Sequence, residues 1–140
     1  MIAVREKLKG NPFKLVQPHR AFTREGEVII EEPQKQKALK LSHFFLFSDI
    51  LIQASPKKSS KFKYKRHFDL QFTKAIALPK ESKPNSFRIL TQDTGFTFSC
   101  NSPAEKEAWV NDINNNIFNL KKNVHNRRVA SQKPPLTQSQ

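Results

Sequence analysis

The most apolar stretch of the chain is Leu39–Ala54, LKLSHFFLFSDILIQA, in a sequence otherwise rich in lysine. It divides into two extended runs, Leu39–Phe47 and Ile50–Ala54, with Ser48 and Asp49 between them. Polar residues of this kind open a tight turn between two strands. Because apolar residues occupy both faces of the first run, we predict a buried β-hairpin near the centre of a sheet.

Shorter β patterns lie on both sides of this hairpin. A first strand is predicted near residues 23–30, where Val28-Ile29-Ile30 has strong β character and Pro33 follows to stop the ladder. Polar turn clusters separate the later candidates, which are Lys61–Leu70, Thr73–Leu78, Ser86–Thr91 and Gly95–Cys100. About seven short strands predict a mostly β fold, an antiparallel barrel or sandwich.

Alternation is clearest in Lys61–Leu70, KFKYKRHFDL. Residues two apart on a strand share a face, so this segment is predicted to have one core face and one wet face. The core face is predicted to carry Phe62, Tyr64, Phe68 and Leu70. The wet face is predicted to carry Lys61, Lys63, Lys65 and His67.

The period changes to that of a helix after Asn101. Ser102-Pro103-Ala104-Glu105 is a capping box with proline at the first helical position. Apolar residues then recur at three- and four-residue spacing and predict one amphipathic α-helix that covers an end of the barrel. This stripe comprises Trp109, Val110, Ile113, Ile117 and Leu120. The helix is predicted to end near Lys121-Lys122, where cations suit the negative end of its dipole.

Both ends of the chain are basic. Gly10 and Pro12 interrupt residues 1–20, which predicts a short helical piece ending near Gly10 and then an extended connector. Residues 1–19 are therefore interpreted as a linker. Residues 123–140 contain no acidic residue, end in KPPLTQSQ, and are predicted to be a disordered tail.

Composition limits the class of protein. With 140 residues the chain is long enough for one domain with a core, and its formal net charge of +13 predicts an anionic partner. No apolar run is long enough for a membrane span or a secretory signal, so a cytosolic location is expected. Cys100 is the single cysteine, which rules out an internal disulfide, and it is expected to be a core strand residue.

The order of elements and several short motifs resemble the pleckstrin homology (PH) domain. Arg24–Val28 looks like the first strand of that family, Phe44–Leu51 like its second and third strands, and Glu105–Trp109 like its helix. The resemblance covers residues 20–122. It implies a seven-stranded antiparallel barrel capped by the amphipathic helix.

A narrower resemblance lies in Lys14–Gly26, KLVQPHRAFTREG. It is similar to the junction between a Dbl homology domain and its PH domain in Rho-family guanine nucleotide exchange factors. This resemblance implies that residues 1–19 hold the end of a preceding exchange-domain helix. It also implies a Rho-family GTPase as a partner through that adjoining domain, and a fragment that is itself monomeric.

Phosphoinositide binding in the PH family depends on basic residues around a phosphate-sized cup. Aligned on this sequence, those positions fall on Glu31, Leu41 and His43, which are poor or weak phosphate ligands, with Lys40 adjacent. We therefore expect weak, salt-sensitive attachment to anionic lipid with low headgroup selectivity. The candidate lipid-binding residues are Lys35, Lys37, Lys40, His43, Lys57, Lys58 and Lys61.

Other functions were weighed against this one. The sequence has no catalytic motif, its four histidines are scattered, and neither an enzymatic activity nor a metal or other cofactor is expected. Nucleic acid fits the charge, but Phe62 and Tyr64 alternate with lysines in a way that places them in the core, so it is not the expected partner. Two alternatives stay open: a protein-binding scaffold without a lipid role, and lysines that form only a solvated rim.

Overall fold

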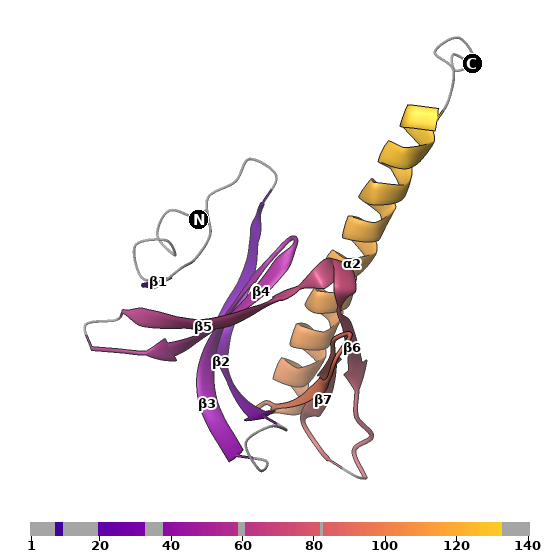
Figure 1. Ribbon diagram of the computed structural model, residues 1–140. Coiled ribbons are helices and arrows are strands. Elements are labelled where there is room, and N and C mark those ends of the chain that lie inside the picture. The colour runs from indigo at the N-terminus through magenta and orange to yellow at the C-terminus, as the bar shows by residue number, and fades with distance from the viewer. Residues whose placement is uncertain (1–7, 10–19, 33–37, 59–60, 82, 133–140) are drawn as a thin grey trace.

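In the computed structural model, the described residues are 8–9, 20–32, 38–58, 61–81 and 83–132. They form eight strands, one 3₁₀ turn and one long helix, arranged with the helix against one side of the sheet (Figure 1). The elements are β1 (Leu8–Lys9), β2 (Phe22–Glu32), β3 (Ala38–Phe47), β4 (Ile50–Pro56), β5 (Phe62–Asp69), η2 (Leu70–Phe72), β6 (Lys74–Ala77), β7 (Ser86–Leu90), β8 (Gly95–Ser99) and α2 (Pro103–Gln132).

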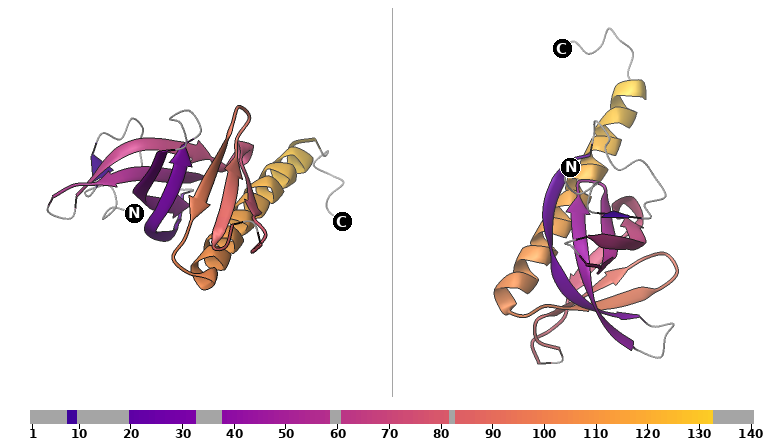
Figure 2. Two further views of the ribbon diagram at one scale, coloured as in Figure 1. Left: turned by 90° about the horizontal axis from the view of Figure 1, so that it is seen from below. Right: turned by 90° about the vertical axis from the view of Figure 1, so that its left-hand side faces the viewer.

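The sheet has the order β1-β5-β4-β3-β2-β8-β7-β6. Strands β2 to β8 pair antiparallel, and the predicted hairpin of β3 and β4, with Ser48 and Asp49 at its turn, lies in the interior of the sheet. The predicted fold of seven antiparallel strands and a C-terminal helix is therefore confirmed. Strong twist turns β6, β7 and β8 across β2–β5 (Figure 2).

One strand was not predicted. Leu8 and Lys9 form β1, which pairs parallel with β5 at Phe62 and Lys63. The prediction of a helical piece ending near Gly10 is wrong for these two residues, and its remaining residues lie outside the described part of the chain. The open edge of β5 provides backbone partners, and such a tertiary contact overrides a weak local helix signal.

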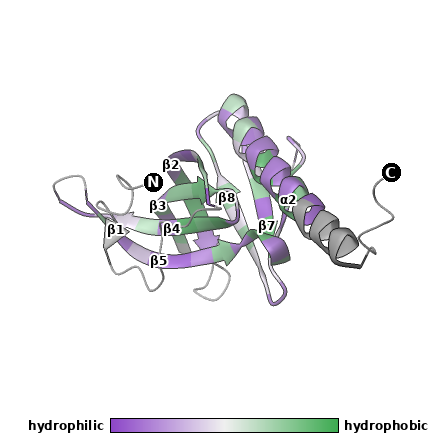
Figure 3. Ribbon diagram, turned by 90° about the horizontal axis from the view of Figure 1, so that it is seen from above, coloured by the Kyte–Doolittle hydropathy of each residue, from purple (hydrophilic) through white to green (hydrophobic). Residues whose placement is uncertain are grey.

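The barrel core lies between the sheet and α2. Its apolar residues come from the inward-facing positions of the strands and from one stripe of the helix, and the apolar colour concentrates on β3 and β4 in Figure 3. They are Val28, Ile30, Phe44, Leu46, Leu51, Phe68, Leu70, Ala75, Phe87, Ile89, Phe96, Phe98, Trp109, Ile113 and Ile117. The predicted helix stripe is confirmed by the burial of Trp109, Ile113 and Ile117.

A second group of apolar side chains lies on the opposite face of β3 and β4, and we call it the outer cluster. It consists of Phe45, Phe47, Ile50, Ile52 and Ala54, all buried. Because both faces of the central hairpin are buried, its sequence is nearly continuous in hydrophobic residues rather than alternating.

A β-bulge at Lys65 reverses the alternation of β5. Gln53 on β4 pairs with Arg66, whereas the next residue, Ala54, pairs with Tyr64, so Lys65 has no residue opposite it. An extra residue of this kind exchanges the two faces for everything beyond it, because the side-chain period of a strand is two.

The predicted common face of Phe62, Tyr64, Phe68 and Leu70 is therefore wrong. Phe62 and Tyr64 pack against the outer cluster, whereas Phe68 and Leu70 belong to the barrel core. The Tyr64 hydroxyl lies 2.6 Å from Nδ1 of His67, a residue predicted on the other face. Unbroken alternation cannot be assumed across a bulge that the sequence does not mark.

The start of α2 is as predicted. The Glu105 backbone N–H donates to Ser102 Oγ at 3.2 Å, and the Glu105 carboxylate accepts from the Asn101 backbone N–H at 3.2 Å. These bonds satisfy N–H groups at the helix N-terminus that have no partner within the helix.

The end of α2 is not as predicted. The helix continues to Gln132, so the predicted end near Lys121-Lys122 is wrong, as is disorder for residues 123–132. Lysines suit a helix end but do not stop a helix, and the first strong breakers are Pro134 and Pro135. The tail beyond Gln132 lies outside the described residues.

Candidate functional site

Four of the predicted lysines are described: Lys40 on β3, and Lys57, Lys58 and Lys61 in the connection between β4 and β5. We call the ends of the β2–β3 and β4–β5 hairpins that carry them the loop end; in Figure 1 the paired ends of β4 and β5 lie at the left and those of β2 and β3 at the bottom. The ladder between β3 and β4 reaches only His43 and Ala54, whereas β2 and β3 stay paired as far as Glu32 and Ala38. Beyond His43, β3 thus pairs with β2 alone, while β2 pairs on its other side with β8 from Ile29 to Glu31.

Strand register decides which residues of β3 face the barrel interior. Lys40 pairs with Ile30, and Ser42 pairs with Val28; both partners belong to the barrel core. Directly opposed residues of an antiparallel pair share a face. Lys40 and Ser42 therefore lie on the inner side.

The three positions taken from the family alignment lie on the other side. Glu31 pairs with Leu39, and Leu41 pairs with Ile29, so they share the outer face with His43, which pairs with Glu27. The inward-facing pair is thus one residue away from the aligned pair, and it contains the cation Lys40. In the sequence, Lys40 is adjacent to the aligned position Leu41. Alternation along a strand does not tell which of two neighbouring residues faces the barrel interior.

A buried side-chain hydrogen bond joins β3 and β4 at Ser42, two residues from Lys40 on the same face of β3. Gln53 Nε2 on β4 donates to Ser42 Oγ on β3 at 2.9 Å, and both residues are buried. This pair was missed in the sequence because each residue stands alone among apolar neighbours. It marks the point at which the apolar core of the hairpin gives way to polar groups toward the loop end.

The β4–β5 loop is held by its own backbone. The Lys57 N–H donates to the Lys61 carbonyl at 2.7 Å, and the Lys61 N–H donates to the Lys58 carbonyl at 3.3 Å. Lys57 and Lys58 are exposed, and Lys61 is half-buried. This loop therefore presents three of the predicted cations together, as the sequence indicated.

Two of the seven candidates, Lys35 and Lys37, lie outside the described residues. His43 is described and is turned away from the loop-end cations. Its Nε2 lies 2.9 Å from Glu25 Oε1, and its ring stacks on Phe62 with centroids 4.4 Å apart. The structure thus brings His43 together with the outer cluster rather than with Lys40.

The aromatic residues considered for nucleic-acid stacking are engaged within the protein. Phe62 stacks on His43 and meets Phe45 edge-on with centroids 5.4 Å apart. Tyr64 packs on the outer cluster and contacts His67. A flat, free aromatic platform of the kind that stacks bases is not formed by this pair.

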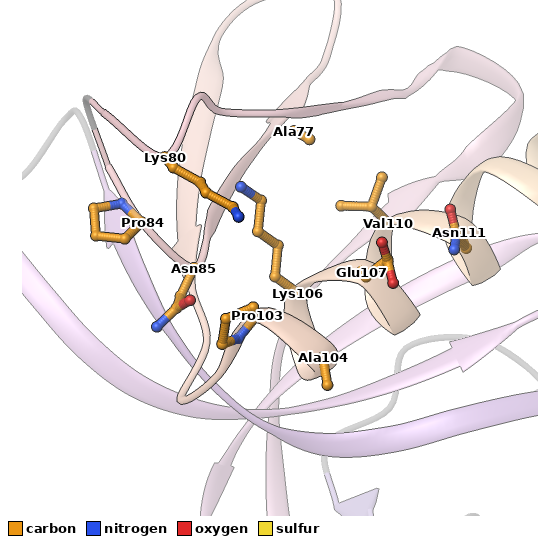
Figure 4. A pocket seen from close by; sticks show the side chains of 10 residues that line it. All are labelled: Ala77, Lys80, Pro84, Asn85, Pro103, Ala104, Lys106, Glu107, Val110 and Asn111. Carbon is orange, nitrogen blue, oxygen red and sulfur yellow. The ribbon is translucent and has the colours of Figure 1, made fainter.

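A groove of about 760 Å³ lies at the start of α2, beside the loop between β6 and β7 (Figure 4). Lys80 and Lys106 point across it toward one another in Figure 4, and Lys106 Nζ donates to the Leu78 carbonyl at 2.6 Å. Glu107 lies on its wall with Ala77 and other small residues. The lining carries charges of both signs, from Lys80, Lys106 and Glu107, and Lys106 is already hydrogen-bonded to the backbone. The groove is therefore not a cluster of cations available to an anion.

Among the described residues no three histidine, cysteine, aspartate or glutamate side chains gather in a way that could hold a metal ion. The described helical segments likewise include none with the length and apolarity that a bilayer span requires.

Cys100 lies one residue beyond β8 and is half-buried against the barrel core, slightly less enclosed than predicted. Burial raises the pKa of its thiol from 9.0 to about 11, with a smaller contribution from the Glu105 carboxylate and an opposing one from Lys106. Because this pKa is higher in the folded protein, the thiol favours folding below pH 9, and that contribution is lost as pH rises toward 11.

We expect Cys100 to react slowly with iodoacetamide while the protein is folded. The thiolate is the nucleophile, and at pH 8 a pKa of about 11 leaves at least tenfold less thiolate than in the unfolded chain. Mass spectrometry of samples quenched over time, with and without 8 M urea, measures both rates; equal rates would contradict the burial of this thiol.

Comparison with known proteins was made on the whole chain. The family model of the SOS1/NGEF-like PH domain matches residues 16–116. The chain belongs to this family. The resemblance to PH domains that accompany Rho exchange domains is thereby confirmed, and the aromatic hairpin, the capped helix and Trp109 that suggested it are all structural features of the domain.

Several FYVE, RhoGEF and PH domain-containing proteins are relatives of this PH domain. Protein 6 from Mus musculus is 27% identical over 117 residues, which cover 84% of this chain and 8% of the relative. Protein 5 from Mus musculus is 28% identical over 95 residues, which cover 68% of this chain and 8% of the relative. The chain thus spans less than a tenth of either relative.

Solved structures show the same fold. An activated truncation of Vav1 superposes with a TM-score of 0.72 at 13% identity, covering 83% of this chain and 31% of that one. The DH/PH fragment of PDZRHOGEF in complex with human RhoA gives a TM-score of 0.65 at 13% identity, covering 83% of this chain and 37% of that one.

Proposed function

We propose that this PH domain is a non-catalytic module of a Rho-type guanine nucleotide exchange factor, and that it attaches weakly to anionic, phosphoinositide-containing membrane. The observation that carries the proposal is the set of cations at the loop end. Lys40 faces the inner side of the barrel, and Lys57, Lys58 and Lys61 occupy one hydrogen-bonded loop.

The physical basis is attraction between charges at a wet surface. Each lysine near an anionic leaflet contributes about 1 kcal/mol, and the attraction falls off within a Debye length. Among the candidate lysines that the structure describes, only Lys40 has the inward position of a cup ligand, while the lysines of the loop are exposed or half-buried. Such an arrangement favours attachment to negative charge in general over selection of one headgroup.

The neighbouring domain is part of the proposal. The relatives named above carry RhoGEF in their names, and the solved neighbours include DH/PH fragments. On this basis an exchange domain precedes the linker of residues 1–19, the PH domain spans residues 20–122, and a Rho-family GTPase is contacted through the exchange domain. The module then acts in the cytoplasm at the inner membrane face and orients that exchange domain.

Sedimentation with vesicles tests the lipid role. Lys57→Gln/Lys58→Gln is expected to lower partitioning onto vesicles containing phosphatidylserine and phosphatidylinositol 4,5-bisphosphate by roughly tenfold or more, since two surface charges are lost. The wild-type chain is expected to leave the vesicles as salt is raised and to ignore neutral phosphatidylcholine vesicles.

Lys121→Gln/Lys122→Gln is the matched control, because it removes the same charge from exposed positions on α2. Partitioning of this control is expected to stay within about twofold of the wild-type value, apart from the general effect of net charge. An equal loss in both variants would show that net charge rather than the loop end carries binding. Wild-type binding that is no better on anionic than on neutral vesicles would refute the membrane role.

A further inference from the structure

The helix α2 extends beyond the sheet that it covers. In Figure 1 and in the right-hand view of Figure 2 its C-terminal end, which reaches Gln132, stands clear of the strands. Among the side chains that the structure describes, Ile117 is the last of α2 to be buried in the barrel core, and Leu120 packs on that core only in part. A short helical segment without tertiary packing is only marginally stable in water. The end of α2 therefore offers a helix surface that a partner can cover and stabilise.

Apolar and cationic side chains lie together on the exposed part of this helix. Phe118 is 66% exposed, and Lys121 and Lys122, three and four residues later, are exposed as well. Residues at these spacings are neighbours on a helix surface. The composition stays the same further along, where the helix contains Arg127-Arg128-Val129. An aromatic side chain beside cations is thus presented to solvent.

This part of the helix contains no acidic residue. No acid follows Asp112 in the chain, and the Asp112 carboxylate accepts a hydrogen bond from Arg24. Two acids lie on elements that α2 contacts, the β3–β4 turn and η2. Asp49 is bound by Arg20, and Asp69 caps the N-terminus of η2. A cationic, partly apolar helix of this kind is complementary to a negatively charged partner with an apolar groove.

The direction of α2 favours a protein partner over a membrane. In Figure 1 the loop end lies at the left and bottom, whereas the C-terminal end of α2 points to the top. A membrane bound at the loop end would therefore not meet the end of α2. Single-stranded nucleic acid stacks its bases on successive aromatic side chains, but Phe118 is the only Phe, Tyr or Trp after Trp109. Helix-binding grooves of acidic proteins, by contrast, take apolar anchors flanked by cations.

We propose that residues 118–132 of α2 are a docking helix for an acidic protein with an apolar groove, of the kind that EF-hand calcium sensors open when they bind Ca²⁺. Such sensors expose a methionine-rich groove, and basic amphipathic helices are typical targets for it. Phe118 and Val129 are the expected anchors, because eleven residues complete about three helical turns and return both positions to one face. The inference does not rest on the proposed membrane role and adds a calcium-dependent partner away from the loop end.

Calmodulin is the probe, because it is an acidic EF-hand sensor with a groove for a helix. Dansyl-labelled calmodulin is titrated with the whole 140-residue chain, and its fluorescence is followed. Saturable one-to-one binding is expected in Ca²⁺, and binding at least tenfold weaker is expected in EDTA, where the groove is closed. Failure of the wild-type chain to bind in Ca²⁺, or equal binding in EDTA, would refute the inference.

Two apolar substitutions test the anchors. Phe118→Ala/Val129→Ala is expected to weaken binding by roughly tenfold or more, since buried anchors dominate the affinity of such grooves. Leu41→Ala/Ile76→Ala is the matched control, because it removes apolar side chains that are 53% and 47% exposed on strands. This control is expected to bind as the wild type does. An equal loss in the two variants would contradict the assignment to α2.

Two charge substitutions test the complementarity. Lys121→Gln/Lys122→Gln is expected to weaken calmodulin binding severalfold and to make it less sensitive to salt. Lys74→Gln/Lys80→Gln removes the same charge from exposed positions near β6 and is the matched control, expected to change binding by less than about twofold. Circular dichroism of each variant checks that helix content is unchanged.

Other occupants have their own readouts. A larger loss in Lys121→Gln/Lys122→Gln than in Lys74→Gln/Lys80→Gln on anionic vesicles, or on fluorescein-labelled poly(U) RNA, would make membrane or nucleic acid the occupant and overturn the protein assignment. The vesicle experiment on Lys57→Gln/Lys58→Gln concerns the loop end alone. Each proposal can therefore fail without the other.

Discussion

Trp109→Ala is expected to lower the free energy of unfolding by about 3–5 kcal/mol, the range for deleting a large aromatic side chain from a packed core. Trp109 is 4% exposed and belongs to the barrel core with Ile113 and Ile117. Its ring passes close to β2, where a Cβ built on Gly26 would meet Cζ2 at 3.5 Å. Truncation would therefore leave a cavity between helix and sheet.

The polar surroundings of Trp109 add to this loss. The Arg24 guanidinium carbon lies 5.7 Å from the centroid of the ring, and Arg24 Nε donates to Asp112 Oδ2 at 2.7 Å. The indole is thus covered on one side by a cation that is itself positioned by the helix. A cation–π contact of this kind adds about 0.5–1 kcal/mol at a partly exposed site.

Urea unfolding followed by circular dichroism measures the change, because the variant lacks tryptophan fluorescence. Phe118→Ala is the matched control on the same helix. Phe118 is 66% exposed, so its truncation is expected to change stability by less than about 0.5 kcal/mol. Comparable losses in the two variants would contradict the proposed contact between α2 and the sheet.

The second large effect is expected at the turn between β3 and β4. Arg20 Nε donates to Asp49 Oδ1 at 2.8 Å and Arg20 Nη2 donates to Asp49 Oδ2 at 3.0 Å, with side chains only 9% and 17% exposed. The Ser48 backbone N–H also donates to the Ala21 carbonyl at 2.8 Å. This bidentate pair ties the chain entering β2 to the central hairpin.

Asp49→Ala is expected to cost about 2–3 kcal/mol, because it leaves a largely buried guanidinium without its carboxylate. A double-mutant cycle with Arg20→Ala isolates the pair, and we expect a coupling energy above about 1 kcal/mol. Asp112→Ala breaks the more exposed Arg24 pair, whose side chains are 35% and 30% exposed, and is expected to cost below about 1 kcal/mol. A coupling energy near zero at Arg20 and Asp49 would contradict this assignment.

Features that depend on neighbours in sequence were predictable. The hairpin turn at Ser48 and Asp49 and the helix start at Ser102–Glu105 both form as expected, because turn and cap chemistry acts over a few residues. The buried helix stripe was also predictable, since an apolar stripe at helical spacing has to pack against apolar residues of the sheet, here the barrel core.

Side chains that join distant elements were not predictable. Asn116 lies off the apolar stripe of the helix, yet its Nδ2 donates to the Phe47 carbonyl at 3.0 Å and to Thr23 Oγ1 at 3.0 Å. Asn114 Nδ2 similarly donates to the Ala75 carbonyl on β6 at 3.3 Å. An asparagine off the apolar stripe has the same local signature whether it faces water or the rim of a sheet.

The lysines of the candidate site illustrate a similar division. Their number and their clustering on two loops were apparent from the chain, and Lys57, Lys58 and Lys61 do lie on one loop. Which of Lys40 and Leu41 faces the barrel was not apparent. Pairing with β2 decides it: Lys40 faces the inner side of the barrel, and Leu41 is exposed on the outer face.

By itself, the sequence determined the seven antiparallel strands, the central hairpin, the start of the capped helix and the PH family. Each rests on local turn chemistry or on a periodicity that needs only an apolar face and a polar face. Tertiary structure alone decided the phase of that alternation: the bulge at Lys65, the inward position of Lys40, and the solvent exposure of Leu39 and Leu41. The reason is that a shift of one residue exchanges the faces of a strand, and only pairing with neighbouring strands determines that shift.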